Sequence, residues 1–222
     1  MFSGLPKTIV SLRHPQCIHN VDYDGALAQG ISNMNSPLTV KGKKQAQVTA
    51  LYLQNTFDSF DRVFASPFLR TQSIPSVAGY DFLIDKRIGE RWHGQLHERG
   101  AAFFRDYPDQ KKLYEDDYYG YCAPDGESCS DVESRLNDFL NDMKSLCDCE
   151  RVLISGHGIS GLLLRKILTN ASRDSWYDWY QNNRLRTASV TVYARVGPYY
   201  ECTSYNFVPN ESVFGKHLDS EA

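Results

Sequence analysis

The sequence contains no long hydrophobic run, and no stretch approaches the roughly 20 apolar residues of a membrane-spanning helix. Its first residues, MFSGLPKTIVSLRH, also lack the apolar segment and small-residue cleavage site of a secretory signal peptide. Glycine (15) and proline (9) are too few for a fibrous or disordered chain of 222 residues. We therefore expect a soluble, cytoplasmic globular protein that does not act at membranes.

Cysteine and net charge are also limited. A chain of this length can bury its own core, so its six cysteines need form no disulfide framework, and free thiols are expected. Cys147 and Cys149 suggest a metal or redox pair, but no second Cys or His pair has matching spacing. The formal net charge of −3 attracts neither nucleic acid nor anionic lipid. A site for a phosphorylated substrate must therefore take its positive charge from a few local arginines.

Short apolar strands alternate with helical segments along the chain. Strands are expected at 7–12, 62–65, 82–84, 151–155, 189–194 and 199–205, and helices at 39–56, from 69 until Pro75, 130–146 and 159–168. Such alternation is typical of parallel strand pairing. The sequence predicts one domain over residues 1–222, a three-layer α/β/α sandwich with a mostly parallel central sheet.

Three segments do not follow this alternation. Residues 15–37 are polar and rich in Asn, Gly and Asp, so a loop is expected. Residues 91–127 alternate charged and aromatic side chains without a helix or strand period, which favours a cap inserted over a site, with a surface loop as the alternative. The polar residues from about 210 to 222 are expected to form a loose tail.

Aromatic residues gather in two places. One set either lines a substrate pocket or packs the cap: Trp92, Tyr118, Tyr119 and Tyr121. The other favours a packed helix: Trp176, Tyr177, Trp179 and Tyr180. Arg184 is expected on the surface, and His19 carries no signal.

Chemically active side chains follow three of the expected strands. They are Arg13 and His14, then Ser66 followed by Arg70, and then the segment 156–158 with sequence GHG. Ligands of open α/β sheets bind outside the carboxyl ends of the strands. Arginine is a forked donor for phosphoryl oxygens, and a neutral imidazole attacks phosphorus when its other nitrogen is oriented. Backbone N–H groups after the second histidine favour an anion. The pattern therefore predicts a phosphoryl-transfer site.

Several short motifs occur in an order that resembles the histidine phosphatase superfamily, which includes the cofactor-dependent phosphoglycerate mutases. The matching motifs are Arg13-His14-Pro15 with Asn20, LTVKGKKQA (38–46), SPFLRT (66–71), GERWHG (89–94), PDGES (124–128) followed by Asp131 and Arg135, and SGHG (155–158). The resemblance covers residues 7 to about 195. It implies the family's fold and chemistry.

The resemblance assigns catalytic roles to five residues. His14 would be the nucleophile that becomes phosphohistidine. Arg13, Arg70 and His157 would bind the phosphoryl oxygens and stabilise charge in the transition state. Glu90 would protonate the leaving alcohol and then activate water. We expect burial or a neighbouring negative charge to keep Glu90 protonated.

Further residues would complete the substrate site. Asn20 would add a hydrogen bond at the pocket edge, Gly158 a backbone N–H, and His93 would face the substrate. His93 and His97 have the spacing of half a zinc helix, but no further ligand stands nearby. No metal or cofactor is expected, since arginines supply the positive charge.

One residue departs from the family pattern. Pro15 replaces the glycine that follows the nucleophile. Proline has no N–H, so any backbone donor at this position of the phosphate site is lost. This change keeps open a second interpretation, a weakly catalytic member that binds another protein.

The choice between hydrolase and mutase rests on the segment after Glu90. The pattern E-R-x-x-G-x-L at 90–96 is typical of mutases, but the Asn-Lys pair that follows it there is missing. Residues 86–122 carry seven basic and seven acidic residues, which gives no surplus of charge for a bisphosphorylated intermediate. FFRDYP (103–108) followed by PDGES resembles the broad-specificity phosphatase branch. The sequence favours a phosphatase for a small phosphomonoester, with phosphoglycerate mutase-type transfer as the alternative, and predicts no particular oligomeric state.

Overall fold

The computed structural model describes residues 4–146 and 149–210. Its strands are β1 (Thr8–Arg13), β2 (Arg62–Ala65), β3 (Leu83–Ile84), β4 (Arg151–Gly156), β5 (Val190–Val196) and β6 (Tyr199–Phe207). Its helices are α1 (Ile18–Val21), α2 (Tyr23–Ala28), α3 (Val40–Thr56), α4 (Leu69–Val77), the 3₁₀ helix η1 (Lys86–Ile88), α5 (Gln95–Arg99), α6 (Ala101–Asp106), α7 (Pro108–Asp116), α8 (Cys129–Leu146), α9 (Gly158–Leu168) and α10 (Arg173–Asn182).

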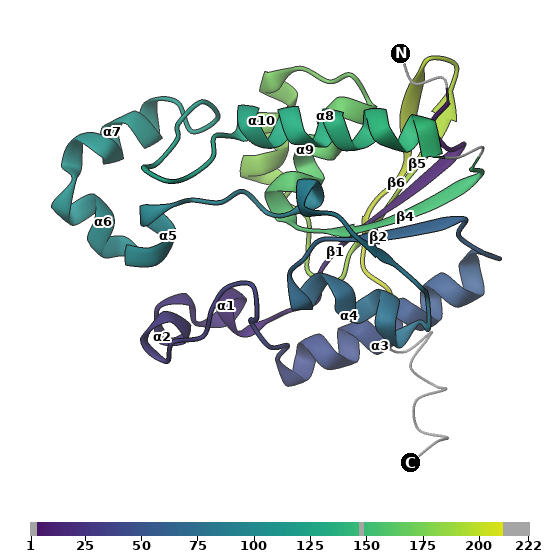
Figure 1. Cartoon of the computed structure of the whole chain (residues 1–222), viewed down its shortest axis with the longest axis horizontal. Helices are drawn as coiled ribbons and strands as arrows, with labels where there is room; N and C mark the ends of the chain where they lie inside the picture. Colours follow the sequence, from purple (N-terminus) through teal and green to yellow (C-terminus); the bar gives the residue numbers. More distant parts are fainter. Residues whose placement is uncertain (1–3, 147–148, 211–222) are drawn as a thin grey trace.

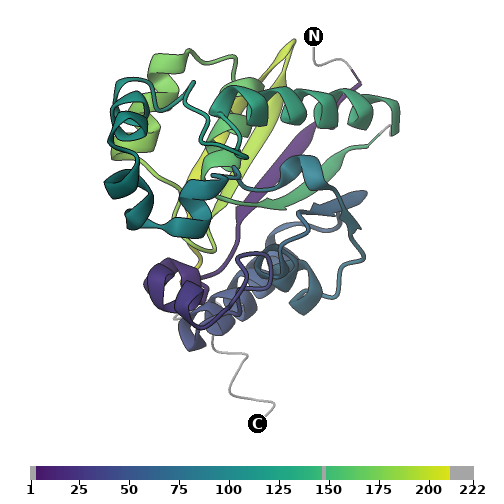
Figure 2. The same ribbon diagram turned by 60° about the vertical axis from the view of Figure 1, so that its left-hand side comes forward.

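The strands form one six-stranded sheet in the order β3-β2-β4-β1-β5-β6. The first four strands in this order pair in parallel, whereas β5 is antiparallel to β1 and to β6. Helices α8, α9 and α10 cover one face, and α3 and α4 cover the other (Figure 1 and Figure 2). The predicted three-layer α/β/α architecture with a mostly parallel sheet is confirmed.

Strand β1 shows how the sheet is held between two hydrophobic cores. Ile9 packs into the core under α8, α9 and α10, while Val10 and Leu12 pack into the core under α3 and α4. Side chains of a strand alternate between the faces, so a strand covered on both sides is apolar throughout. Burying each such side chain stabilises the fold by about 1.5–3 kcal/mol. The two cores fix the carboxyl end of β1, which His14 directly follows.

Two segments contain helices that the sequence did not indicate. Residues 15–37, expected to be a loop, include α1 and α2, and residues 91–127 include α5, α6 and α7. The Asp22 side chain starts α2 by accepting a hydrogen bond from the N–H of Gly25, and α7 has Pro108 at its first position. All five helices span nine residues or fewer, so they are too short to show a hydrophobic period.

Helix α4 continues through Pro75 to Val77 instead of ending before the proline. Proline cannot donate to the carbonyl four residues earlier, which belongs to Thr71. The hydroxyl of Ser155 donates to that carbonyl instead, at 2.6 Å. A side chain from β4 thus replaces the missing helical hydrogen bond.

The short helices lie together at one end of the sheet. Figure 1 shows α1 and α2 with α5, α6 and α7 beyond the end toward which β1 runs. The hydroxyl of Tyr23 in α2 donates to the carbonyl of His97 in α5, at 2.8 Å. Helix α2 and the 91–127 segment are therefore joined directly.

The cysteines follow the expectation in part. Cys17, Cys122, Cys129 and Cys202 are free thiols, whereas Cys149 is disulfide-bonded. The expectation of free thiols is wrong for Cys149, because it rested on chain length and compartment rather than local geometry. Cys147 and most of the expected tail, 211–222, lie outside the described residues. No helix within 4–146 or 149–210 is long and apolar enough to cross a membrane.

Candidate active site

The predicted catalytic residues meet at the carboxyl ends of neighbouring strands. His14 follows the last residue of β1 and His157 the last residue of β4, and these two strands pair in parallel. The His14 N–H donates to the carbonyl of Gly156 at 3.0 Å, and the two imidazole centroids are 5.3 Å apart. Arg70 lies in the first turn of α4, after β2. The sheet topology therefore brings together residues that are 143 positions apart in sequence.

His14 has the protonation state of a nucleophile. Its side chain is 3% exposed, and its Nδ1 lies 2.7 Å from the carbonyl oxygen of Pro15. Burial, followed by the charges of Arg70 and Arg13, holds the pKa of His14 well below its ordinary value of 6.5. Because a carbonyl only accepts, Nδ1 carries the proton and Nε2 keeps its lone pair. The Pro15 carbonyl thus orients a neutral ring whose Nε2 carries no proton.

The two arginines beside His14 each keep an unused donor. Arg70 donates through Nη1 to the backbone and side-chain oxygens of Asn33, at 2.5 and 3.0 Å, and Arg13 donates to the carbonyl of Leu185. The Nε atoms of both arginines are buried and have no hydrogen-bond partner in the described part of the chain. Buried donors without partners are costly, and an anionic ligand would satisfy both.

His157 has both ring nitrogens engaged within the protein. Its Nδ1 lies 3.4 Å from Nη2 of Arg70, and its Nε2 lies 2.7 Å from the hydroxyl of Ser66. The arginine can only donate, so Nδ1 accepts and Nε2–H donates to Ser66. Burial, then the charge of Arg70, holds the pKa of His157 well below 6.5. In this arrangement His157 orients Arg70, and neither nitrogen is free for a phosphoryl oxygen.

The Glu90 carboxylate lies at the N-terminus of α9. Its Oε2 accepts from the N–H groups of Gly158 (2.9 Å) and Ile159 (3.2 Å), and its Oε1 accepts from those of Ser160 and Arg91 (both 3.1 Å). Glu90 is partly buried, which agrees with one of the two surroundings expected for it, and four N–H donors rather than a second negative charge face its carboxylate. The Gly158 N–H, expected to bind substrate, is occupied by Glu90.

Sequence comparison decides the family. A model described as the histidine phosphatase superfamily (branch 1) matches residues 9–207 of the chain. The chain belongs to the histidine phosphatase superfamily. A probable phosphoglycerate mutase of Enterobacter sp. is 31% identical over 165 residues, which cover 71% of this chain and 72% of the relative. A phosphoglycerate mutase-like protein of Arabidopsis thaliana is 27% identical over 199 residues, which cover 79% of this chain and 67% of the relative.

Solved structures of other family members share the fold. A putative alpha-ribazole-5'-phosphate phosphatase of Escherichia coli superposes with a TM-score of 0.75 and 17% identity, covering 92% of this chain and 96% of that one. A mycobacterial glucosyl-3-phosphoglycerate phosphatase superposes with a TM-score of 0.69 and 19% identity, covering 90% of this chain and 99% of that one. The family thus contains both phosphatases and mutase-like proteins.

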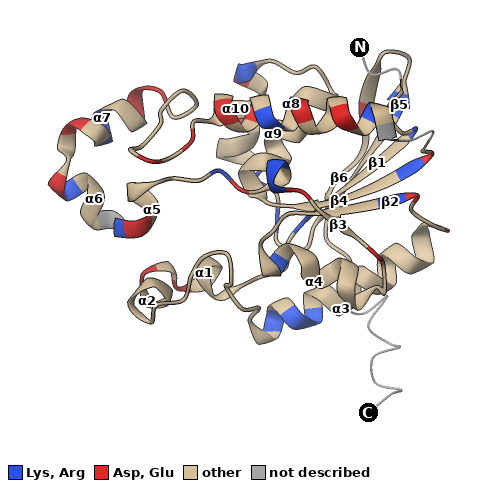
Figure 3. Cartoon of the chain, viewed as in Figure 1, with Lys and Arg blue, Asp and Glu red and all other residues tan. Residues whose placement is uncertain are grey.

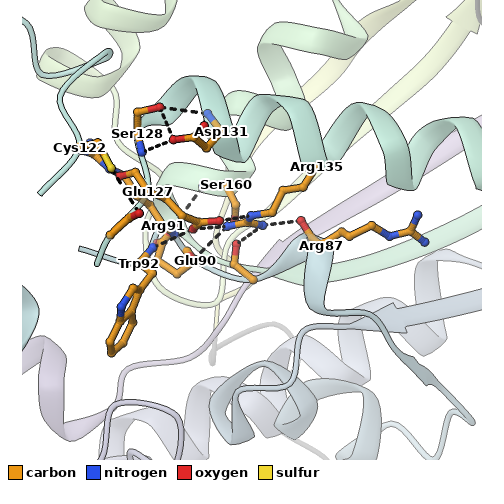
Figure 4. Close-up of polar contacts among 12 residues, drawn as sticks. Arg87, Glu90, Arg91, Trp92, Cys122, Glu127, Ser128, Asp131, Arg135 and Ser160 are labelled. Carbon is orange, nitrogen blue, oxygen red and sulfur yellow. Dashed lines mark hydrogen bonds and ion pairs between the residues drawn. The ribbon is translucent and has the colours of Figure 1, made fainter. Parts of the chain in front are cut away.

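A residue of the family motif PDGES, together with Arg135, fixes the backbone next to Glu90. Glu127 of this motif forms an ion pair with Arg135 at 2.8 Å and accepts from the N–H of Trp92 at 3.0 Å. Arg135 donates to the carbonyls of Gly89 and Glu90, both at 3.1 Å (Figure 4). These contacts fix the backbone on both sides of the carboxylate. The sequence showed the motif, but only the structure shows that it positions Glu90.

Two predicted binding residues have mainly local roles. The Oδ1 of Asn20 accepts from the N–H and the thiol of Cys17, at 3.0 and 3.3 Å, and so caps α1. His93 lines the pocket, and burial together with Arg91 lowers its pKa to about 3. His97 packs against Trp92, with centroids 4.7 Å apart and ring planes tilted by 40°. Among the described residues, no group of three or more His, Cys, Asp or Glu is placed to hold a metal.

A pocket of about 270 Å³ extends from the catalytic residues toward the 91–127 segment. Besides Arg13, Glu90, His93 and Gly158, it is lined by Tyr114, Tyr118, Ile159, Leu162, Tyr180, Arg184 and Leu185. Arg184 is exposed, as the sequence predicted, yet it also lines the pocket, and the sequence indicated no role there for Arg184 or Tyr114. These residues reach the pocket only through the tertiary fold. Tyr118 lines this pocket, which agrees with one of the two roles left open for the aromatic residues of the 91–127 segment.

His19 is a second residue that the sequence did not indicate. Its side chain is 8% exposed, its Nδ1 lies 2.8 Å from the Ser36 hydroxyl, and its Nε2 is buried without a partner in the described residues. Burial, followed by the charge of Arg70, lowers its pKa. A neutral imidazole therefore stands near the arginine that would bind phosphate.

Proposed function

We propose that the protein is a phosphatase that hydrolyses a small phosphomonoester through a phosphohistidine intermediate on His14. The observation that carries this proposal is the neutral His14 ring, oriented by the Pro15 carbonyl beside the unpaired buried Nε donors of Arg13 and Arg70. A nucleophile with a free lone pair thus faces two cationic groups that suit phosphoryl oxygens.

The reaction would run in two steps. Nε2 of His14 attacks phosphorus, the bond to the leaving oxygen breaks, and the Glu90 carboxyl gives that oxygen its proton. Water then gives a proton to the Glu90 carboxylate and attacks the phosphohistidine, which releases inorganic phosphate and restores neutral His14. Arg13 and Arg70 donate to the nonbridging oxygens throughout. The 91–127 segment would act as a cap, which is supported by His93, Tyr114 and Tyr118 lining the pocket.

Mutase-type transfer is the second candidate, because relatives are named as mutases and the E-R-x-x-G-x-L pattern is present. A mutase must retain a bisphosphorylated intermediate, which needs a surplus of positive charge. Figure 3 shows acidic and basic residues interspersed over α5, α6 and α7, which favours hydrolysis. The third interpretation, a weakly catalytic binding protein, rested on Pro15, whose carbonyl here orients the nucleophile.

The decisive test is His14→Ala with 4-nitrophenyl phosphate. We expect turnover to fall on the order of 10³-fold or more, since the covalent path is removed. Wild-type protein denatured with SDS at alkaline pH during turnover of ³²P-labelled substrate should carry label, because phosphohistidine is stable in alkali, and the variant should carry none. Unchanged thermal unfolding of the variant excludes misfolding. Full activity of His14→Ala would overturn the covalent mechanism.

A separate assay distinguishes the two reactions. The wild-type protein is incubated with 3-phosphoglycerate and its bisphosphate, and isomerisation and phosphate release are measured together. Hydrolysis predicts phosphate release without efficient isomerisation. Rapid isomerisation with little free phosphate would show that the mutase alternative is correct.

A further inference from the structure

A third arginine, Arg184, lies beside the proposed active site. Arg184 lines the same pocket as Arg13 and Glu90. Burial, together with the like charge of Arg184, lowers the pKa of Arg13. Two guanidinium groups therefore line one small pocket, and only Arg13 of the two belongs to the phosphoryl site proposed above.

Arg184 is held in position by α10. Its Nε donates to the carbonyl of Tyr180 at 2.6 Å, and its guanidinium carbon lies 4.1 Å above the centre of the Tyr180 ring. Five of the arginines in the described chain form ion pairs with carboxylates: Arg87, Arg99, Arg105, Arg135 and Arg173. Arg184 has no such ion pair within 4–146 or 149–210. Its charge is thus anchored at Nε and not neutralised by the protein.

The pocket offers little else to balance this charge. Glu90 is the only carboxylate among the described lining residues, and backbone N–H groups already face both of its oxygens. Arg184 is therefore the one cationic side chain among the described lining residues that the phosphoryl site proposed above does not use. A second anionic group on a ligand could pair with it.

The aromatic side chains of the pocket do not favour a planar leaving group. The ring of Tyr180 is stacked against Trp176 and Tyr118, with centroids 5.2 and 4.7 Å apart, and carries Arg184 over it. The ring of Tyr118 lies under Arg91 at 4.8 Å. These ring faces are already used within the protein, so hydroxyl groups and ring edges remain for a ligand. The lining suits a small polar leaving group.

We propose that Arg184 determines specificity by binding a second anionic oxygen group, such as a carboxylate, on the leaving group of the substrate. This inference rests on the proposed phosphatase function, because it assumes that the phosphoryl group lies against His14, Arg13 and Arg70. The substrate class is then a small, non-aromatic phosphomonoester whose alcohol carries a second negative charge. A guanidinium binds such a group through charge-assisted hydrogen bonds.

The test compares two substrates of equal size that differ by one charge, 3-(phosphonooxy)propanoate and its amide. We expect the wild-type kcat/KM to be about tenfold or more higher for the carboxylate, the usual strength of a charge-assisted hydrogen bond. Arg184→Gln should remove most of this preference, because it should lower kcat/KM for the carboxylate much more than for the amide. Arg184→Lys should restore part of it.

Arg186→Gln is the matched control. Arg186 lies two residues further along and donates to the backbone carbonyl of Asn206 in β6, at 2.8 Å. Arg186→Gln removes one positive charge, as Arg184→Gln does, but at a residue that does not line the pocket. The kcat/KM values for the carboxylate and for the amide should therefore both stay near wild type. An equal loss with Arg186→Gln would overturn the proposal, because a general effect of net charge would explain the result.

Binding of non-hydrolysable phosphonate analogues of the two substrates, measured by calorimetry, separates the inference from the proposed function. A carboxylate preference in Kd that disappears in Arg184→Gln supports the proposal even where no phosphate is released, and then only the phosphatase function fails. Equal Kd values in the wild type, or the same loss for both analogues in Arg184→Gln, would overturn it.

Discussion

At the scale of single residues, Glu90 sets the strictest condition on the mechanism. Its two oxygens accept four backbone N–H groups, which fill the lone-pair positions of a carboxylate. A proton on this group must displace one of these bonds, since an N–H donor needs a free lone pair. Accepting a proton from water therefore also requires one of these hydrogen bonds to break. Donation to the leaving group requires the carboxyl to move away from α9.

Glu90→Gln should affect substrates according to their leaving groups. We expect hydrolysis of an alkyl phosphate to fall about 10²–10⁴-fold, because the alkoxide leaves without a proton. The nitrophenolate of 4-nitrophenyl phosphate needs no proton, so rapid mixing should show a burst of about one product per enzyme before slow turnover. Glu98→Gln, a nearby acidic residue outside the described pocket lining, serves as control. Equal losses for both substrates without a burst would show that Glu90 only stabilises α9.

At the scale of elements, α4 shows how the sheet supports Arg70, the arginine proposed to bind the phosphoryl group. The helix carries Arg70 in its first turn and contains Pro75, which leaves the Thr71 carbonyl without its helical partner. The Ser155 hydroxyl supplies the hydrogen bond from β4. The side chains of both Thr71 and Ser155 are fully buried, so water is no substitute. Helix and strand are therefore coupled directly behind the site.

Ser155→Ala should lower the free energy of unfolding by about 1–3 kcal/mol, because it leaves a buried carbonyl unsatisfied. In that background Pro75→Ala should restore part of the loss, since the N–H of alanine can donate to Thr71. Urea denaturation of the wild type, both single variants and the double variant measures the coupling, expected at about 0.5–3 kcal/mol. Strictly additive effects would show that Ser155 does not compensate for Pro75.

Elements with local signals were predictable from the sequence, and those without them were not. Helix α3 was placed correctly because Thr39 caps it by accepting from the Gly42 N–H, and β2 because a short apolar run precedes Ser66. The strand ends also showed that His14 and His157 would meet. The donors around Glu90 depend on how α9 approaches η1, and Arg184 reaches the pocket only through α10. No local pattern encodes such contacts.

At the scale of the whole molecule, several histidines are kept neutral around one end of the sheet. Burial is the largest cause of the lowered pKa of His14, His157, His93 and His97, and the last two reach about 3 and about 4. Neutral rings suit a nucleophile and avoid adding charge beside Arg13 and Arg70. This arrangement has a cost in acid, because the unfolded chain can protonate these rings and the folded one cannot.

The protein should therefore lose stability as the pH falls below 6.5. As the pH falls, each histidine with a lowered pKa is protonated in the unfolded state before it is protonated in the folded state. Its contribution to the free energy of unfolding is therefore complete above pH 6.5 and declines below it. For the fully buried His14 and His157 the decline is about 1.4 kcal/mol per pH unit each. Urea unfolding at pH 7.5, 6.5, 5.75 and 5.0 measures the slope, in a range above the titration of most carboxylates. His14→Gln should reduce the slope by about 1.4 kcal/mol per pH unit, which corresponds to one proton. A free energy of unfolding that stays constant down to pH 5 would contradict the inference that these histidines are neutral.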